Sequence, residues 1–544
     1  MKNKSLLILS SLFLFTLCGC NSASGTSDNN TSKREPYKLI KKENEKVTIK
    51  TKTGIPFLMQ SAVIRTDLFI NADNSTISDL EDYFALAKET GLNCLEIPFM
   101  WKEVEPSFNN YDYSDIDTYL SFAKKYDIKI NLLWYGSFTD GETHTNNMPS
   151  YIEEDYNTYS LIQFCYPSSV FGDCVILDYS DSDLLNRESL AIKNLFNHIA
   201  TWNEENDYCD PILMAQVGAG VDRLTRWRIN QYDIKINNEI MTSEYAWNMI
   251  NSYVSSISKA FKDSNYVPIT RVEFCEQQAV TNYCRDIFDI STVDIVNTTY
   301  LHTVAQTKTG IKNFDDEFGE NEPIINTENF ANNDNYRIAL ATFALGGSGF
   351  AAYHLSSPLY YPMENNLGFL YRRKNAEGTT LEEKFEDPYN RGKAYKEVNE
   401  MIQKGYVAVA RAKRNCFGLF GFDNLLATGQ TQKQYMTNGL MFDYTCSSSS
   451  IGYAIYLNNY FYVLSNQDAS LKISNCYVQA ASAGSFNLDS MWSKDEDVLT
   501  NNEQLFSLEA NKLYRFNISN ISSLPSLDEL NSLGYKTILD SIRG

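Results

Sequence analysis

The stretch Ile212-Leu-Met-Ala-Gln-Val217, followed at once by Gly218-Ala-Gly220, decides the fold. A short apolar run that stops at glycines is typical of a buried strand with an abrupt loop behind it. Seven further segments of this kind are found at 57–63, 94–99, 129–135, 269–274, 293–297, 323–327 and 349–353. Amphipathic helical patterns separate several of them, so the sequence predicts an α/β fold, a TIM (β/α)8 barrel.

Two connections between the strands carry further information. After the first strand a helix is predicted, with Ser78 and Glu81 as a capping box at its start and Gly91 at its end. The long stretch 136–180 after the third strand holds no clear element. Loops of that length are usually functional or disordered, and in a barrel this one would lie on the carboxyl-terminal face. It is therefore predicted to form a rim or a lid.

The chain is predicted to have five parts. Residues 1–20 are a lipoprotein signal peptide, 21–45 a flexible tether, 46–400 the barrel, 401–520 a β-sandwich-like antiparallel domain and 521–544 a C-terminal appendage. Within the fourth part, 451–457 and 460–464 flank Asn458-Asn459 and are predicted to pair as a β-hairpin.

The first twenty residues carry targeting signals. Lys2 and Lys4 precede an apolar run from Leu6 to Leu17, which is too short to span a bilayer comfortably. Leu17-Cys-Gly-Cys20 resembles the bacterial lipoprotein box, in which the Cys after Gly is lipidated. The resemblance implies export and a lipid anchor at Cys20, in the bacterial cell envelope at the outer membrane or cell surface. An ordinary cleaved secretory signal is the alternative.

Composition excludes some classes of function. A formal net charge of −21 argues against a nucleic-acid partner, because phosphate binding needs a basic patch. The 36 Tyr and 30 Phe supply rings for core packing and, in addition, flat apolar faces on which sugars stack. Only four His occur, without a His-Glu-x-x-His or EF-hand pattern, so neither a metal nor another cofactor is predicted.

Several segments together carry a resemblance to a known family. They are Gly54 to Phe57 with Gln60, Gly91 to Pro106, Leu132 to Ser137, Gln216-Val217, Pro323 to Glu328, and Gly346 to Phe350. In this order, over about residues 50–360, they resemble the barrel strands of glycoside hydrolase clan A, nearest to the β-galactosidase-like families 35 and 42. The resemblance implies a glycosidase-type barrel with an oligosaccharide or polysaccharide as its partner.

The resemblance also implies roles for single residues. Glu328 takes the place of the nucleophile at the end of the seventh strand. Arg65, after the first strand, is a candidate partner that would hold Glu328 ionised, with a surface salt bridge as the alternative. The other predicted substrate contacts are Trp101, Trp134, Tyr135, Gln216, Tyr300, His302 and Tyr353. Tyr300 is also a candidate hydrogen-bond donor to the nucleophile. For Trp101, Trp134, Tyr135 and Tyr353, packing within the barrel is the alternative.

The fourth strand departs from the family in one respect. Family members read Gln-Val-Glu-Asn-Glu there, and the last Glu is the general acid/base. Gly218, Ala219 and Gly220 stand in the last three of those places. Neither Gly nor Ala donates a proton, so general-acid help worth about 10²–10⁴-fold would be missing.

Three explanations of this departure stay open. Asp222 or Glu276 takes over as acid/base, or the substrate has a leaving group that needs no proton, or the barrel is a catalytically inactive, glycan-binding pseudoenzyme. The chain is thus either a β-galactosidase-like glycoside hydrolase with a degenerate acid/base position or a binding protein. An unrelated barrel enzyme such as an aldolase is disfavoured, because no Lys ends a predicted barrel strand.

Overall fold

The chain divides into two compact units, Met1–Ser32 and Lys33–Gly544. Every residue that the computed structural model describes belongs to the second unit. The described residues are 33–40, 48–51, 57–64, 66, 80–136, 148–153, 161–165, 173–177, 181–217, 234–236, 239–240, 242–274, 293–299, 307, 310–311, 322–329, 338–339, 342–343, 347–357, 370–374, 381–386, 395–396, 398–399, 431–435, 441–446, 451–457, 460–465, 468–474, 477–487, 490–492, 496–498, 504–509 and 513–519. The predicted signal peptide with Cys20 and the appendage 521–544 lie outside them.

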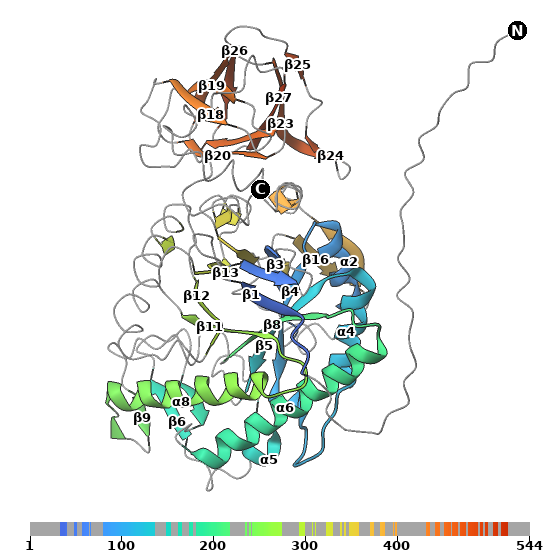
Figure 1. Ribbon diagram of the computed structural model, residues 1–544, viewed down its shortest axis with the longest axis vertical. Coiled ribbons are helices and arrows are strands. Elements are labelled where there is room, and N and C mark those ends of the chain that lie inside the picture. The colour runs from blue at the N-terminus through green and yellow to red at the C-terminus, as the bar shows by residue number, and fades with distance from the viewer. Residues whose placement is uncertain are drawn as a thin grey trace, which may run out of the picture. The chain divides into compact units, whose positions relative to one another are not determined.

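Eight parallel strands form a closed barrel (Figure 1). In chain order they are β3 (Met59–Val63), β4 (Cys94–Met100), β5 (Lys129–Tyr135), β8 (Ile212–Gln216), β11 (Ile269–Phe274), β12 (Ile295–Thr299), β13 (Ile325–Asn329) and β14 (Gly349–Ala352). Neighbours in the barrel follow one another in the chain, and β14 closes the ring by pairing with β3. The predicted TIM-like α/β fold is confirmed, and each of the eight predicted segments overlaps one barrel strand.

Helices follow each of the first four barrel strands. They are α2 (Glu81–Glu89) and the short α3 (Trp101–Val104), then α4 (Ser114–Tyr126), α5 (Ser150–Glu153), α6 (Ser182–Glu205) and α8 (Ser243–Lys262). Buried Tyr83, Phe84 and Ala87 line one face of α2, as helical spacing requires. Leu80 precedes the first residue of α2 and makes no side-chain capping bond, and Ser78, the predicted N-cap, lies outside the described residues.

A small antiparallel sheet lies in the connections after the third and fourth barrel strands. It consists of β6 (Leu161–Cys165), β7 (Asp173–Leu177), β9 (Ile234–Ile236) and β10 (Glu239–Ile240), in the order β10-β9-β6-β7. The stretch 136–180, predicted to hold no element, thus contains a helix and two strands. Short strands of mixed composition leave too few residues for a period to stand out.

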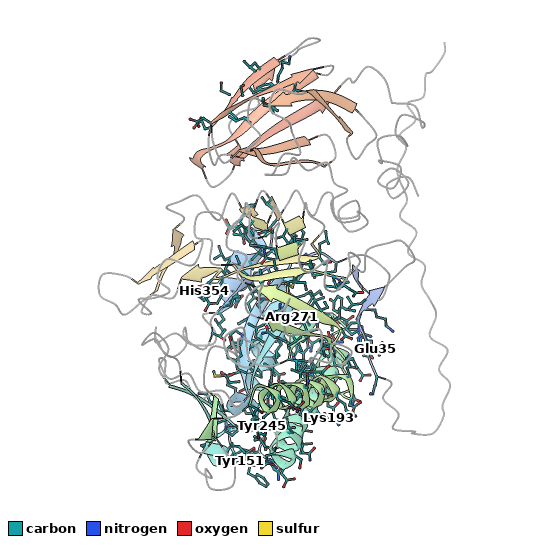
Figure 2. The ribbon with its side chains drawn as sticks, turned by 90° about the vertical axis from the view of Figure 1, so that its left-hand side faces the viewer. Glu35, Tyr151, Lys193, Tyr245, Arg271 and His354 are labelled. Carbon is teal, nitrogen blue, oxygen red and sulfur yellow. The ribbon has the colours of Figure 1, made fainter. Side chains whose placement is uncertain are left out.

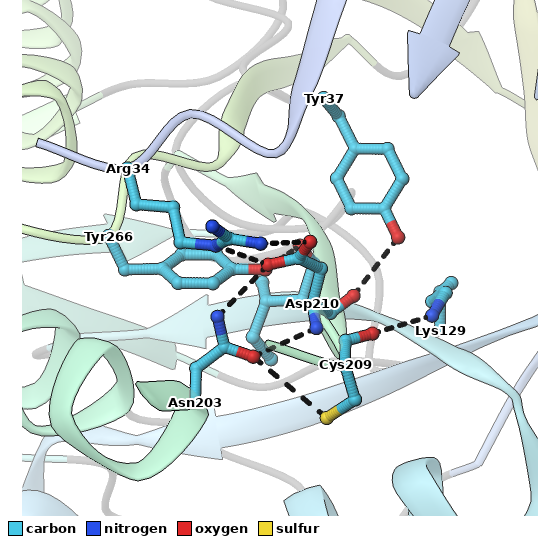
Figure 3. Close-up of polar contacts among 8 residues, drawn as sticks. Arg34, Tyr37, Lys129, Asn203, Cys209, Asp210 and Tyr266 are labelled. Atoms are coloured by element: carbon cyan, nitrogen blue, oxygen red, sulfur yellow. Dashed lines mark hydrogen bonds and ion pairs between the residues drawn. The ribbon is translucent and has the colours of Figure 1, made fainter. Parts of the chain in front are cut away.

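The amino-terminal end of the barrel is covered by the hairpin of β1 (Tyr37–Ile40) and β2 (Thr48–Thr51). Tyr37 and Ile49 pack with Met59, Cys94 and other barrel residues in one buried cluster. Figure 3 shows the polar contacts that accompany this packing, centred on Arg34 and Asp210. The predicted tether 21–45 therefore overlaps the folded unit, because 33–40 already belong to it.

Further strands that the structure describes follow the barrel in the chain. One sheet holds β15 (Ser356–Ser357), β16 (Leu370–Lys374) and β17 (Leu381–Glu386). Two antiparallel sheets hold β18 (Thr431–Tyr435), β19 (Met441–Cys446), β22 (Ala469–Ser474) and β26 (Gln504–Leu508), and β20 (Ile451–Leu457), β21 (Tyr460–Ser465), β27 (Leu513–Ser519), β23 (Tyr477–Asn487), β24 (Ser490–Trp492) and β25 (Glu496–Val498).

The pairing of β20 with β21, Leu457 opposite Tyr460, confirms the predicted hairpin. Grouping these strands into a single β-sandwich-like domain at 401–520 stays a prediction. Of the helices that the structure describes, none combines the length and apolar character needed to cross a membrane.

Candidate active site

The carboxyl ends of parallel barrel strands open on a single face, where the active sites of such barrels form. β8 is the fourth strand of the barrel and β13 the seventh. Gln216 is the last residue of β8, and Glu328 is the last but one of β13. The pairing of β13 with β14 shifts register between Asn326 and Asn329, the stretch that contains Glu328. Such bulges are frequent beside active sites.

Several predicted site residues cannot be located in the structure. Those that lie outside the described residues are Arg65, Asp222, Glu276, Tyr300, His302 and the replaced motif Gly218-Ala-Gly220. Of Glu328, the structure describes the backbone within β13. The proposed roles of all these residues stay predictions.

A buried polar cluster lies inside the barrel, where Figure 2 labels Arg271 among the strands. Arg271 donates from Nη2 to Glu96 Oε1 and to Gln216 Oε1, each at 2.8 Å, and Asn131 Nδ2 donates to Glu96 Oε1 at 2.7 Å. The four side chains come from the adjacent strands β4, β5, β8 and β11 and are at most 1% exposed. The ion pair between Glu96 and Arg271 is therefore screened very little by water.

Burial shifts the pKa of one residue of this cluster. Loss of hydration raises the pKa of the Glu96 carboxyl, although the Arg271 cation and the Asn131 amide oppose the rise. Sequence reasoning included Gln216 but missed the other three residues of the cluster. A signal for two of them was present, since Glu96 and Arg271 are charged residues of opposite sign inside predicted barrel strands. Buried charges are rare unless they are paired.

Trp134, a predicted sugar contact near the end of β5, is held by a buried carboxylate. Its indole Nε1–H donates to Glu188 Oε1 on α6 at 2.8 Å, and Tyr253 OH on α8 donates to the same oxygen at 2.7 Å. Trp134, Glu188 and Tyr253 are all fully buried. Gly136 lies so close that a Cβ there would stand 2.0 Å from Glu188 Oε1. These contacts position the carboxyl end of β5.

Trp101, the other predicted tryptophan contact, is fully buried directly after β4. Its indole N–H donates to Glu105 Oε2 at 3.1 Å. Tyr135 is half-buried as the last residue of β5, and Tyr353 is 6% exposed directly after β14. The structure thus gives both tryptophans carboxylate partners, while contact of any of these rings with sugar stays a prediction.

The described part of the chain holds no group of three or more His, Cys, Asp or Glu suited to a metal ion.

This chain is similar to known proteins in structure and not in sequence. No sequence model of a known protein family matches the chain, and no curated protein matches it. Among solved structures, it is similar to the exo-beta-1,4-mannosidase Op5Man5 from Opitutaceae bacterium strain TAV5, with a TM-score of 0.44 and 10% identity over 65% of this chain and 61% of that one. It is also similar to a family 1 b-glucosidase from Thermotoga maritima, with a TM-score of 0.41 and 7% identity over 64% and 97%.

The class of protein rests on the topology of the chain itself, which is that of a TIM-like α/β barrel. The chain spans about three fifths of the length of the mannosidase. Neither solved structure assigns a role to a residue of this chain.

Proposed function

We propose that the chain is an exported, lipid-anchored, glycoside hydrolase-like protein that acts on or binds β-linked, galactoside-type glycans. The observation that best supports the proposal is the order of the barrel strands. The two segments that resemble the catalytic strands of the family, at 212–220 and 323–328, belong to the fourth and seventh strands of a closed parallel barrel. Two strand ends on one face are what a two-carboxylate glycosidase site needs.

In this proposal Glu328 attacks the anomeric carbon and forms a covalent glycosyl-enzyme. A retaining glycosidase needs a second carboxyl group, about 5–5.5 Å away, to protonate the departing oxygen and later to activate water. Position 220 supplies none. Glycosides whose leaving group departs as a stable anion are therefore the expected substrates, because they need no proton.

Hydrolysis of aryl β-galactosides with and without azide tests this proposal. With a good leaving group such as 2,4-dinitrophenolate, Glu328 would be glycosylated quickly, and azide would then take the sugar without general-base help. The expected result is faster turnover with azide and formation of the β-galactosyl azide. Glu328→Gln, the matched control, should abolish both. Turnover that azide does not accelerate would indicate a relocated acid/base, with Asp222 and Glu276 as the residues to replace next.

A restoring variant provides a complementary test. Ala219→Asn with Gly220→Glu rebuilds the last two residues of the family motif. Turnover of an alkyl β-galactoside, whose leaving group needs a proton, should then rise by about 10²–10⁴-fold. No gain in a folded variant would contradict the proposed role of position 220.

A glycan-binding pseudoenzyme is the second candidate function. It is favoured by the loss of all three motif residues after Val217, rather than of the acid/base alone. Sugar binding without turnover of any aryl galactoside, with or without azide, would support this candidate.

The proposed anchor rests on the Leu17-Cys-Gly-Cys20 segment. Cys20→Ser should prevent palmitate labelling and release the protein from the membrane fraction. Unchanged fractionation would refute the anchor.

A further inference from the structure

Phe108 is an aromatic ring held at the tip of a tight turn. The turn is closed by Asn110 N–H, which donates to Ser107 O at 2.9 Å, and Asn109 adopts a positive φ of 58°, which Asn tolerates well. The Phe108 side chain is 59% exposed. Single exposed apolar residues are common, so the exposure alone shows no function. The contacts behind the ring distinguish it.

A buried carboxylate holds the turn in place. Glu105 is fully buried and accepts hydrogen bonds from Trp101 Nε1 at 3.1 Å and from the backbone N–H of Asn109 at 2.9 Å. Arg187 Nη2 on α6 forms an ion pair with Glu105 Oε1 at 2.7 Å. The guanidinium carbon of Arg187 lies 3.9 Å from the centre of the Phe108 ring. The Arg187 cation thus covers one side of the Phe108 ring and is itself held by the Glu105 carboxylate.

A second ring stands at right angles to the first. Tyr151 on α5 meets Phe108 edge-to-face, with centroids 5.6 Å apart and planes at 86°. Its OH accepts a hydrogen bond from Arg187 Nη2 at 3.1 Å. The Arg187 guanidinium therefore binds the carboxylate, contacts Phe108 and donates to Tyr151. Rings fixed in this way lose little conformational freedom when they bind a ligand.

The pair of rings belongs to the same end of the barrel as the candidate active site. Phe108 follows the carboxyl end of β4, Tyr151 follows that of β5, and Arg187 lies near the start of α6, which also follows β5. In Figure 1, α5 lies beside α6, and Figure 2 labels Tyr151 away from the Arg271 cluster inside the barrel. Loops after barrel strands form the carboxyl-terminal face, the face to which Glu328 and the residues after β8 belong.

We propose that Phe108 and Tyr151 form an outer subsite, which stacks one neutral pyranose unit of a longer β-linked glycan whose other end occupies the central site. This inference rests on the proposed function for the identity of the ligand. A neutral sugar fits, because Arg187, the cation that the described residues place at the rings, is already neutralised by Glu105. A chain with a net charge of −21 also repels a polyanionic glycan.

Titration calorimetry with neutral β-1,4-galacto-oligosaccharides, from the disaccharide to the hexasaccharide, tests the subsite. In the wild type, affinity should rise with length once the chain reaches the rings. Phe108→Ala should raise Kd for the hexasaccharide about tenfold, as loss of a central aromatic contact typically does, and leave Kd for the disaccharide unchanged. Phe108→Tyr keeps a flat ring and should bind like the wild type.

Tyr208→Ala is the matched control. Tyr208 is also an exposed ring, at 48%, with the Arg34 guanidinium 4.5 Å from its centre, but it precedes β8 and so belongs to the opposite end of the barrel. This variant should bind every oligosaccharide like the wild type. Galacturonate oligomers of the same length should bind more weakly than the neutral ones.

The outcomes separate the two levels of the inference. Suppose that the wild type binds these sugars, but Phe108→Ala weakens binding of the disaccharide and the hexasaccharide equally or leaves both unchanged. The subsite is then refuted and the proposed function stands. If the wild type binds none of them, the proposed function fails and the subsite fails with it. Tighter binding of galacturonate oligomers would refute the neutral ligand. A thermal midpoint equal to that of the wild type shows that Phe108→Ala is folded, as expected for an exposed side chain.

Discussion

Replacement of Gly136 by Ala should destabilise the barrel strongly, although it adds a single methyl group. The added Cβ would stand 2.0 Å from Glu188 Oε1, so the carboxylate has to move by at least 1.0 Å to restore even the shortest observed Cβ contact of 3.0 Å. That oxygen accepts from Trp134 at 2.8 Å and from Tyr253 at 2.7 Å. Two hydrogen bonds to a buried charged group, each worth about 1.5–3 kcal/mol, give an expected loss of about 3–6 kcal/mol.

Urea unfolding followed by tryptophan fluorescence measures this loss, and a double-mutant cycle identifies its cause. Glu188→Ala alone should be destabilising by a similar amount, because it leaves the Trp134 and Tyr253 donors buried without that acceptor. Once Glu188 is an alanine, the clash is gone, and Gly136→Ala should cost about 1 kcal/mol or less. A cost as large in the Glu188→Ala background as in the wild type would refute the reasoning, since the strain would then lie elsewhere.

Two further predictions concern charged side chains, the buried Glu96 and the half-buried Arg34. The pKa of Glu96 in the folded protein lies above its ordinary value, so the folded protein binds the Glu96 proton more tightly than the unfolded chain does. The stabilisation that this proton contributes is fully present below the ordinary pKa and is lost as pH rises through the raised pKa. The thermal midpoint of wild type minus that of Glu96→Gln should therefore fall as pH rises above the ordinary glutamate pKa of about 4.3, and a difference that grows with pH would show that the ionised pair with Arg271 dominates. Arg34→Ala should lower stability by about 1–3 kcal/mol, measured by urea unfolding, because the two-bond pair with Asp210, at 2.6 and 2.5 Å, is lost. Arg34→Lys keeps the charge and loses the planar fork, so its stability should lie between that of the wild type and that of Arg34→Ala. If Arg34→Ala is as stable as the wild type, the packing of Tyr37 and Ile49 alone holds the hairpin.

The barrel could be predicted from the sequence because each strand is a short apolar run, as is typical of parallel strands that are buried on both faces. Lys129–Tyr135 and Ile269–Phe274 were predicted with their observed bounds. The sixth and seventh strands begin and end two residues later than predicted, at Ile295–Thr299 and Ile325–Asn329. Both of them end in polar residues, which an apolar pattern leaves out.

The polar contacts of the candidate site could not be predicted from the sequence in the same way. Glu188 and Trp134 are 54 positions apart and Arg271 and Glu96 175 apart, so only the folded chain brings them together. The β6–β7 hairpin was missed for a different reason, since each of its strands has five residues, too few for a periodic pattern to stand out within a long connection. The resemblance to a family predicted where barrel strands lie in the chain. It did not predict which side chains contact one another.

The interior cluster holds the carboxyl end of the fourth barrel strand in place. The end of β8 is held by the same residue twice, through Arg271 Nη2 to Gln216 Oε1 at 2.8 Å and through Val217 N–H to Arg271 O at 2.7 Å. Arg271 is anchored in turn by Glu96 on β4, across the barrel interior. These bonds hold the end of β8 through residues that precede position 218. A thermal midpoint of Ala219→Asn with Gly220→Glu equal to that of the wild type would show that this variant is folded, and its turnover would then test chemistry rather than stability.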